Sequence, residues 1–299
     1  MKIGRSVKFL LILGLWLQPN VGRADIISVG GTTVDIPNPP GFAPITAQMT
    51  GLYEWQRETE PPGNKEFMSY IAESEIPWVL SHKSEVPDLE RRFSVQTAKS
   101  LIDVSLSRSD FLKIKQGIKT KNDEIFRKVE KLIPGIIQNA NKDIIKQFGA
   151  DRALSIPQIV PLPPHEETDR TLAYSGLLKY ESKDESANPT SYVMVVTSTF
   201  IHVKAKVLFL YSWAEESGLE WSRNVSKEWA DAIVAANPGD LESSVKEALP
   251  SPIVGVGTDW GKVASMAILG VILASYTALK RTRNPKKPNP ASTTDAIRG

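Results

Sequence analysis

The sequence contains no cysteine and only three histidines. Without cysteine, the chain cannot form disulfides, hold zinc or iron–sulfur clusters through thiolates, or use a thiol nucleophile. The histidines are His82, His165 and His202, and no two of them have the i, i+4 spacing of a helical metal pair. We therefore expect no metal site, no cofactor and no catalytic residue.

Two motif families are also missing. The segment Tyr174-Ser175-Gly176 lacks the first glycine of a nucleophile elbow and falls within a predicted strand. The glycine-rich stretch from Gly255 to Lys262 ends in Gly-Lys but does not have the glycine and hydroxyl positions of a phosphate-binding loop. We interpret that stretch as a flexible hinge.

Charge is distributed unevenly along the chain. Residues 1–24 carry four basic side chains and no acidic one, whereas residues 280–299 carry six basic side chains and one acidic one. Because the whole chain has a net charge of +2, the remaining region has a net charge of −7. A mildly acidic folded region argues against nucleic-acid binding.

The N-terminus has the pattern of a secretory signal peptide. Three basic residues precede a short apolar core, and Gly22 and Ala24 stand at positions −3 and −1 of a cleavage site. We expect residues 1–24 to be removed, with an uncleaved anchor as the alternative.

The longest uncharged run, Val263–Leu279, predicts a membrane-spanning helix. At about 1.5 Å per residue it reaches roughly 26 Å, close to the thickness of a hydrocarbon core. A bacterial inner membrane fits best, with the main domain periplasmic or extracellular and the basic tail, residues 280–299, cytoplasmic. The predicted interface anchors are Trp260, Lys262, Lys280, Arg281 and Arg283.

Small residues follow one face of this predicted helix. Gly270, Ala274 and Ala278 lie four residues apart, and such a face lets two membrane helices approach closely. Self-association through this face is one interpretation. The other is that these are ordinary residues of a membrane helix.

Residues 25–238 are expected to form the extracytoplasmic domain, with residues 239–262 as a linker. A hairpin is predicted over Ile26–Ile36 around Gly30-Gly31, followed by a helix over Thr46–Glu58. Phe67–Ala72 and Arg92–Ala98 are predicted strands, joined by a polar loop with two prolines. The proline-rich Ile156–Pro164 is expected to be an extended surface connection.

Ser109–Phe148 is predicted to be helical, with a break at Pro134 and a lysine-rich face. That face is interpreted as solvated, the alternative being contact with anionic lipid or an acidic partner. The lysines concerned are Lys113, Lys115, Lys119, Lys121, Lys128, Lys131, Lys142 and Lys146.

The strongest strand signals come late in the chain. Thr171–Tyr180, Tyr192–Val203 and Val207–Trp213 are predicted strands, and Tyr192–Val203 has the two-sided apolar pattern of a central strand. Leu219–Asn237 is a predicted helix whose apolar residues recur every four positions and should pack on the sheet. These residues are Trp221, Val225, Trp229 and Ile233. The fold class expected is α+β, a mostly antiparallel sheet flanked by helices in an α/β/α sandwich-like arrangement, plus one C-terminal transmembrane helix.

The order of elements resembles the PsbP-like family of small α/β/α sandwich domains. The resemblance is carried by the opening hairpin with IPNPPGF (Ile36–Phe42), the strand pair Tyr192–Trp213 and the tryptophan-bearing helix Trp221–Ala236. It implies a non-enzymatic binding or assembly factor and no catalytic residues. The long helical region and the predicted anchor depart from the simple family pattern.

Three functional hypotheses follow. The first is a single-pass, membrane-anchored envelope protein whose extracytoplasmic domain binds a protein partner or ligand without catalysis. The second is a membrane-anchored hydrolase acting on envelope material, which would need polar residues gathered in a cleft. The third is a scaffold that acts through its basic cytoplasmic tail.

Overall fold

The computed structural model describes residues 24–58, 60, 63–83, 87, 89–120, 152–184 and 187–239. In this part of the chain, no helix combines the length and apolar character needed to cross a membrane. The predicted membrane helix, the basic tail, the linker beyond Gly239 and residues 1–23 lie outside the described ranges. Ala24 is the first residue of a strand.

The described part contains ten strands, and α-helices and 3-10 turns connect them. The strands are β1 (Ala24–Val29), β2 (Thr32–Pro37), β3 (Phe42–Pro44), β4 (Asn64–Ala72), β5 (Arg92–Ala98), β6 (Arg152–Pro161), β7 (Glu166–Glu167), β8 (Thr171–Asp184), β9 (Ala187–Val203) and β10 (Lys206–Glu215). The helices are α1 (Thr50–Glu58), α2 (Ile76–Ser81), α4 (Leu219–Ala236) and a helix described over residues 108–120. The 3-10 turns are Glu73–Glu75, Lys99–Leu101 and Glu216–Gly218.

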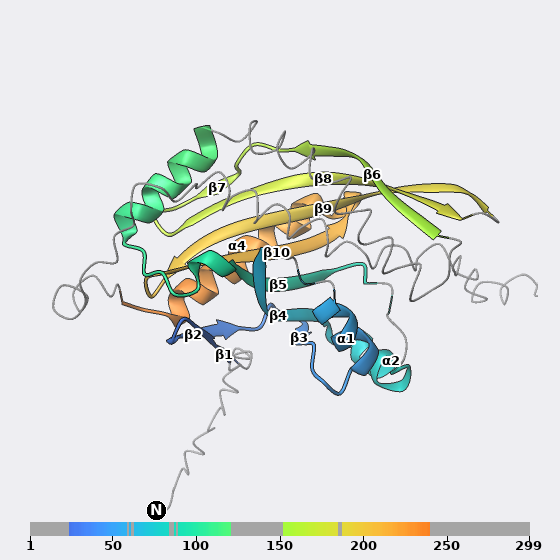
Figure 1. The fold of residues 1–299 in the computed structure, drawn as a ribbon, viewed down its shortest axis with the longest axis horizontal. Helices are drawn as coiled ribbons and strands as arrows, with labels where there is room; N and C mark the ends of the chain where they lie inside the picture. Colours follow the sequence, from blue (N-terminus) through green and yellow to red (C-terminus); the bar gives the residue numbers. More distant parts are fainter. Residues whose placement is uncertain are drawn as a thin grey trace, which may run out of the picture.

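One large antiparallel sheet organises these elements (Figure 1). Its strand order is β3-β4-β5-β10-β9-β8-β6, with β7 paired to β8, while β1 and β2 form a separate hairpin. Helix α4 packs on one face, and α1 and the 108–120 helix contact the other. The predicted α+β fold, a mostly antiparallel sheet flanked by helices, is confirmed.

The first hairpin forms where the sequence predicted it. Gly30 and Gly31 have φ values of +54° and +79°, the left-handed region that a tight hairpin turn requires. A side chain at Gly30 would also collide with the chain, because its Cβ would lie 2.1 Å from the carbonyl oxygen of Ile102. Glycine at this position therefore satisfies both the turn and the close approach.

Helix α4 covers its face of the sheet through the predicted tryptophan stripe. Trp229 and Ile233 are buried, whereas Trp221 and Val225 are partly buried against the same core. The Trp229 indole Nε1 donates a 2.7 Å hydrogen bond to the carbonyl oxygen of Pro37 on β2. Helix α4 therefore joins the first hairpin to the sheet.

Two segments differ from the sequence-based expectation. The polar loop before β5 contains the short helix α2. Pro77 lies in the first turn of this helix, where the backbone N–H has no partner within the helix and a proline is therefore tolerated. The expected surface connection at Ile156–Pro164 instead begins as part of edge strand β6. Pro157 lies within the register shift between Ser155 and Gln158. A bulge in an edge strand tolerates a residue that has no backbone N–H.

The described start of the predicted 109–148 helix is confirmed, and residues 121–148 lie outside the described ranges. Ser107 and Asp110 form a reciprocal cap at its first turn. The Asp110 amide donates to Ser107 Oγ at 3.1 Å, and the Ser107 amide donates to Asp110 Oδ2 at 3.4 Å. The Ser107 hydrogen bond lowers the pKa of Asp110. Helix α1 begins at Thr50, four residues later than predicted.

Candidate functional site

The two faces of the large sheet differ in chemistry. Side chains of alternate residues point to opposite faces, so Phe93 and Val95 face α4, whereas Arg92, Ser94 and Gln96 face away from it. On β10, Tyr211 pairs with Ser94 and Trp213 pairs with Arg92. We call the face formed by Glu66, Arg92, Ser94, Gln96, Tyr211 and Trp213 the polar–aromatic face, and the opposite face the α4 face.

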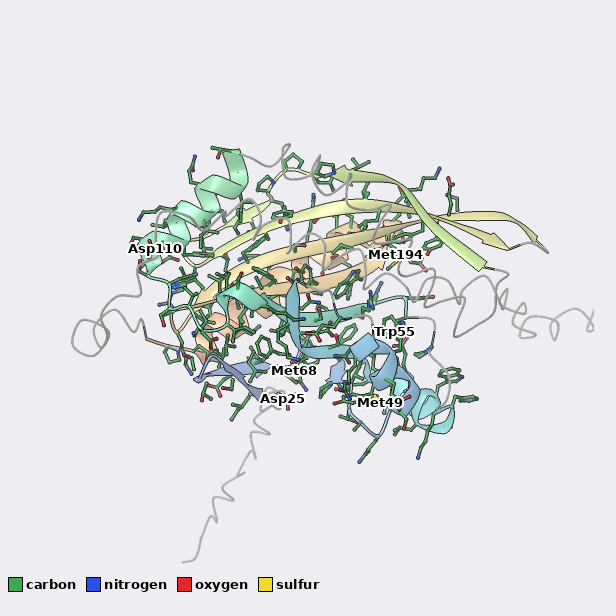
Figure 2. The ribbon with its side chains drawn as sticks, viewed as in Figure 1. Asp25, Met49, Trp55, Met68, Asp110 and Met194 are labelled. Carbon is green, nitrogen blue, oxygen red and sulfur yellow. The ribbon has the colours of Figure 1, made fainter. Side chains whose placement is uncertain are left out.

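The guanidinium group of Arg92 lies over two indole rings. Its guanidinium carbon is 4.3 Å from the ring centre of Trp213 on β10 and 5.5 Å from that of Trp55 on α1. Figure 2 shows Trp55 where α1 meets the sheet. Arg92 is only 5% exposed, and desolvation lowers its pKa to about 10, so it remains a cation at neutral pH.

Two donors of this guanidinium have no hydrogen-bond acceptor. The nitrogens Nε and Nη2 of Arg92 are buried, and among the described residues no acceptor lies within hydrogen-bonding reach of them. Buried polar groups in proteins are nearly always hydrogen-bonded, and an unsatisfied one costs about 1–3 kcal/mol. A buried arginine with two unused donors is therefore an unusual feature of this face.

Glu66 on β4 is the carboxyl group whose charge acts on Arg92. Its Oε1 accepts hydrogen bonds from Ser69 Oγ and from Gln56 Nε2, the latter at 2.8 Å, and its Oε2 accepts one from Gln96 Nε2 at 3.1 Å. Desolvation raises the pKa of Glu66 to about 7, although these bonds and the charge of Arg92 act in the opposite direction.

Amide and phenol groups extend the network across the strands. Asn64 Nδ2 donates to Gln96 Oε1 at 3.0 Å, and Gln96 Nε2 also donates to Ser94 Oγ at 3.1 Å. Asn64 is hydrogen-bonded to Tyr211, whose pKa burial raises well above its usual value. The result is a neutral phenol and three amide or hydroxyl groups that are fixed beside a cation and a titratable carboxyl.

This arrangement is suited to binding. The Glu66 carboxylate is held by three donors, so its position is fixed by the network. The cation is held by stacking on aromatic rings, and its Nε and Nη2 edge remains free of described acceptors. A planar guanidinium edge recognises carboxylate or phosphate oxygens in pairs.

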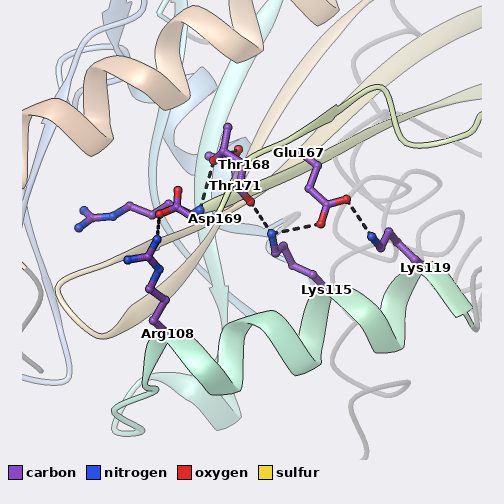
Figure 3. A network of polar contacts seen from close by, with 8 residues as sticks. Arg108, Lys115, Lys119, Glu167, Thr168, Asp169 and Thr171 are labelled. Atoms are coloured by element: carbon purple, nitrogen blue, oxygen red, sulfur yellow. Dashed lines mark hydrogen bonds and ion pairs between the residues drawn. The ribbon is translucent and has the colours of Figure 1, made fainter.

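A second polar cluster serves to attach a helix (Figure 3). Lys115 donates to the carbonyl oxygen of Thr168 and pairs with Glu167 at 3.2 Å, and Lys119 pairs with the same carboxylate at 2.9 Å. Arg108 pairs with Asp169 in the turn before β8. These contacts fix the 108–120 helix to the β7–β8 connection.

The lysine-rich face is therefore not wholly solvated as interpreted from the sequence. Lys115 is 3% exposed and belongs to the attachment cluster, whereas Lys113 is exposed and pairs with Asp110 at 3.2 Å. The helical period alone could not show this, because the acceptors come from a connection about fifty residues later in the chain. Lys121, Lys128, Lys131, Lys142 and Lys146 lie outside the described residues.

The three histidines occupy separate surroundings. His82 follows α2 and stacks on Trp78, and His202 on β9 stacks on Phe111. His165 precedes β7, where desolvation and the nearby charge of Arg223 lower its pKa. In the described ranges, no group of three His, Asp or Glu side chains is placed to hold a metal ion.

Ser175 belongs to a buried hydroxyl seam under α4. It lies 2.9 Å from Thr197 Oγ1, and Ser222 on α4 donates to the same Thr197 atom at 2.8 Å. Ser212 on β10 continues the seam to Ser226 at 2.6 Å. Small hydroxyl side chains that satisfy one another let the helix approach the sheet closely, which is a packing role.

The sequence reasoning missed Glu66, Arg92 and the tryptophans that flank Arg92. The available signal was the alternation of Arg92, Ser94 and Gln96 with apolar residues in a predicted strand. Such a pattern ordinarily indicates a solvent-facing side, whereas β5 is buried along its whole length. The predicted membrane contacts Gly270, Ala274 and Ala278 and the interface anchors from Trp260 to Arg283 lie outside the described residues.

Comparisons with known proteins give weak resemblances of fold. No protein-family profile and no curated protein sequence matches this chain. A solution structure of cyanobacterial PsbP (CyanoP) from Synechocystis sp. PCC 6803 is similar at 12% identity and a TM-score of 0.28, covering 75% of this chain and 96% of that one. The Saccharomyces cerevisiae Ran-binding protein Mog1p is similar at 14% identity and a TM-score of 0.22, covering 72% and 90%. Likenesses this low carry no argument about function.

Proposed function

We propose that residues 25–238 form a non-catalytic binding domain, held outside the cytoplasm by a membrane helix at residues 263–279. The observation that carries the binding role is the polar–aromatic face, where a stacked arginine and a fixed carboxyl stand among aromatic side chains. Perturbed titratable groups gathered on one face are typical of functional sites.

The membrane location is supported by the sequence alone. The uncharged run Val263–Leu279 is followed by a tail, residues 280–299, that contains six basic residues, and the N-terminus has a signal-peptide pattern. Protease added to spheroplasts, in which the inner membrane is closed and its outer face is accessible, should digest the domain and spare the tail. Digestion of the tail alone would contradict the proposed orientation.

The hydrolase alternative has no support among the described residues. Ser175 is fully buried under α4 and hydrogen-bonded to Thr197, and the three histidines have separate surroundings. A nucleophile needs a base within hydrogen-bonding reach and access to substrate.

Photo-crosslinking in intact membranes tests the binding role. A photoreactive residue replaces Arg57, which is exposed on α1 next to the residue that holds Glu66. The matched control replaces Glu228, which is exposed on α4. We expect a discrete adduct from position 57 and none from position 228. Equal adducts from both positions, or none from position 57, would contradict the proposal.

A further inference from the structure

The two unused donors of Arg92 are a matched pair. In a guanidinium group, the Nε–H and one Nη2–H point in parallel from the same edge, at a spacing that fits the two oxygens of a carboxylate. Both atoms are buried without an acceptor among the described residues. The unused capacity of Arg92 is thus one complete bidentate edge.

The surroundings hold that edge in place. The guanidinium carbon lies over the rings of Trp55 and Trp213, so cation–π contacts hold the arginine, while its Nε and Nη2 donors have no acceptor among the described residues. A donor pair that is already ordered loses little conformational entropy when an acceptor arrives. The side chain is therefore preorganised for an oxyanion.

The carboxylate whose charge acts on Arg92 forms its hydrogen bonds with other residues. Both carboxylate oxygens of Glu66 accept hydrogen bonds from Gln56, Ser69 and Gln96, and no ion pair joins Glu66 to Arg92 among the described residues. The charge of Glu66 still lies close enough to influence Arg92. A nearby carboxylate disfavours a second multiply charged group, so a singly charged oxyanion fits this environment better than a phosphate dianion.

We propose that the Nε and Nη2 edge of Arg92 binds a carboxylate group of the partner or ligand that the domain recognises. This inference rests on the proposed binding function and names the chemistry of what is bound. Several titratable groups act on this edge or on one another across the face: Glu66, Glu60, Tyr174, Tyr180 and Tyr211.

The test uses the full-length protein in detergent micelles, with benzoate, acetate and phosphate as probes at ionic strength held constant with chloride. The thermal midpoint is followed by tryptophan fluorescence. Benzoate and acetate should raise the midpoint with saturation, and phosphate should act more weakly. No saturable effect of either carboxylate, or a larger effect of phosphate, would overturn the inference.

Two neighbouring arginines provide the matched variants. Arg92→Lys keeps the charge and removes the bidentate edge, so benzoate should bind at least about tenfold more weakly. Arg91→Gln changes an exposed residue that lies 4.3 Å from the ring centre of Trp221, and benzoate affinity should stay unchanged. Equal weakening in both variants, or none in Arg92→Lys, would contradict the assignment.

A third variant keeps the test decisive if Arg92→Lys does not fold. Glu66→Gln removes the neighbouring negative charge, so benzoate should bind several-fold more tightly at pH 8. Unchanged or weaker binding would refute the inference. A discrete adduct from position 57 without any benzoate effect would refute the carboxylate site and leave the proposed binding function standing.

Discussion

The two faces of the large sheet are both buried, yet they achieve burial differently. The α4 face contains Phe93, Val95, Leu208 and Leu210 against Trp229, and its hydroxyl groups satisfy one another in the seam at Ser212 and Ser222. The polar–aromatic face carries a cation with unused donors and a carboxyl whose pKa is raised to about 7. The α4 face therefore stabilises the fold. The polar–aromatic face retains the free-energy cost of unsatisfied buried donors, which a bound acceptor group would remove.

The largest change in stability is expected from a substitution on the α4 face. Trp229→Ala should lower the free energy of unfolding by about 3–5 kcal/mol, because it removes a buried indole and its hydrogen bond to Pro37. Denaturant unfolding of the full-length protein measures this change. Trp78→Ala is the control, because this exposed indole should cost far less. Similar losses in both variants would contradict the assignment of α4 as the stabilising layer.

The next effect concerns the polar–aromatic face and depends on pH. Between about pH 4.5 and 7 the folded protein keeps a proton on Glu66 that the unfolded chain has lost, so stability falls as pH rises through this window. Above pH 7 the cost is complete. In Glu66→Gln this cost is absent, so its stability relative to the wild type should improve by about 1–3 kcal/mol from pH 4.5 to pH 8.

Asp110 is the control, because its substitution should change stability with pH in the opposite direction. The bond from Ser107 lowers the pKa of Asp110, so its stabilisation is present above the unfolded-state pKa and is lost as pH falls through the folded-state value. The free energy of unfolding of Asp110→Asn should therefore fall relative to that of the wild type as pH rises from acid to neutral. A Glu66→Gln difference that does not vary with pH, or varies like that of Asp110→Asn, would show that Glu66 is not destabilised by burial.

The smallest effect is expected at the β9–β10 turn. Lys204 and Ala205 have φ values of +48° and +60°, a region that costs L-residues about 1 kcal/mol and glycine little. Ala205→Gly should raise the thermal midpoint slightly, by the equivalent of about 0.5–1 kcal/mol. Gly31→Ala, with φ +79° on the first hairpin, should lower it. A loss of stability in Ala205→Gly would contradict this explanation of the turn.

Sequence patterns predicted the parts of the fold that depend on local periodicity. The tryptophan stripe of α4 and the long strands β8 to β10 carry repeated apolar signals, and the structure confirms them. Prolines misled the interpretation where tertiary pairing overrides local preference. Pro77 lies in the first turn of α2 and Pro157 lies in the bulge of edge strand β6, although both suggested loops.

The candidate site could not be predicted because its parts are distant in sequence. Trp55, Glu66, Arg92 and Trp213 come from α1, β4, β5 and β10, and only the strand order brings them together. The polar alternation of β5 was visible in the sequence, but its burial was not. That burial depends on elements covering both faces of the sheet.

The most direct test of the central claim measures the position-57 adduct in intact membranes for three proteins: the wild-type background, Arg92→Lys and Arg91→Gln. If the polar–aromatic face binds the partner through Arg92, the adduct yield falls in Arg92→Lys and is unchanged in Arg91→Gln, and position 228 gives no adduct. An adduct that persists unchanged in Arg92→Lys, or that forms from position 228 on α4, would contradict the account.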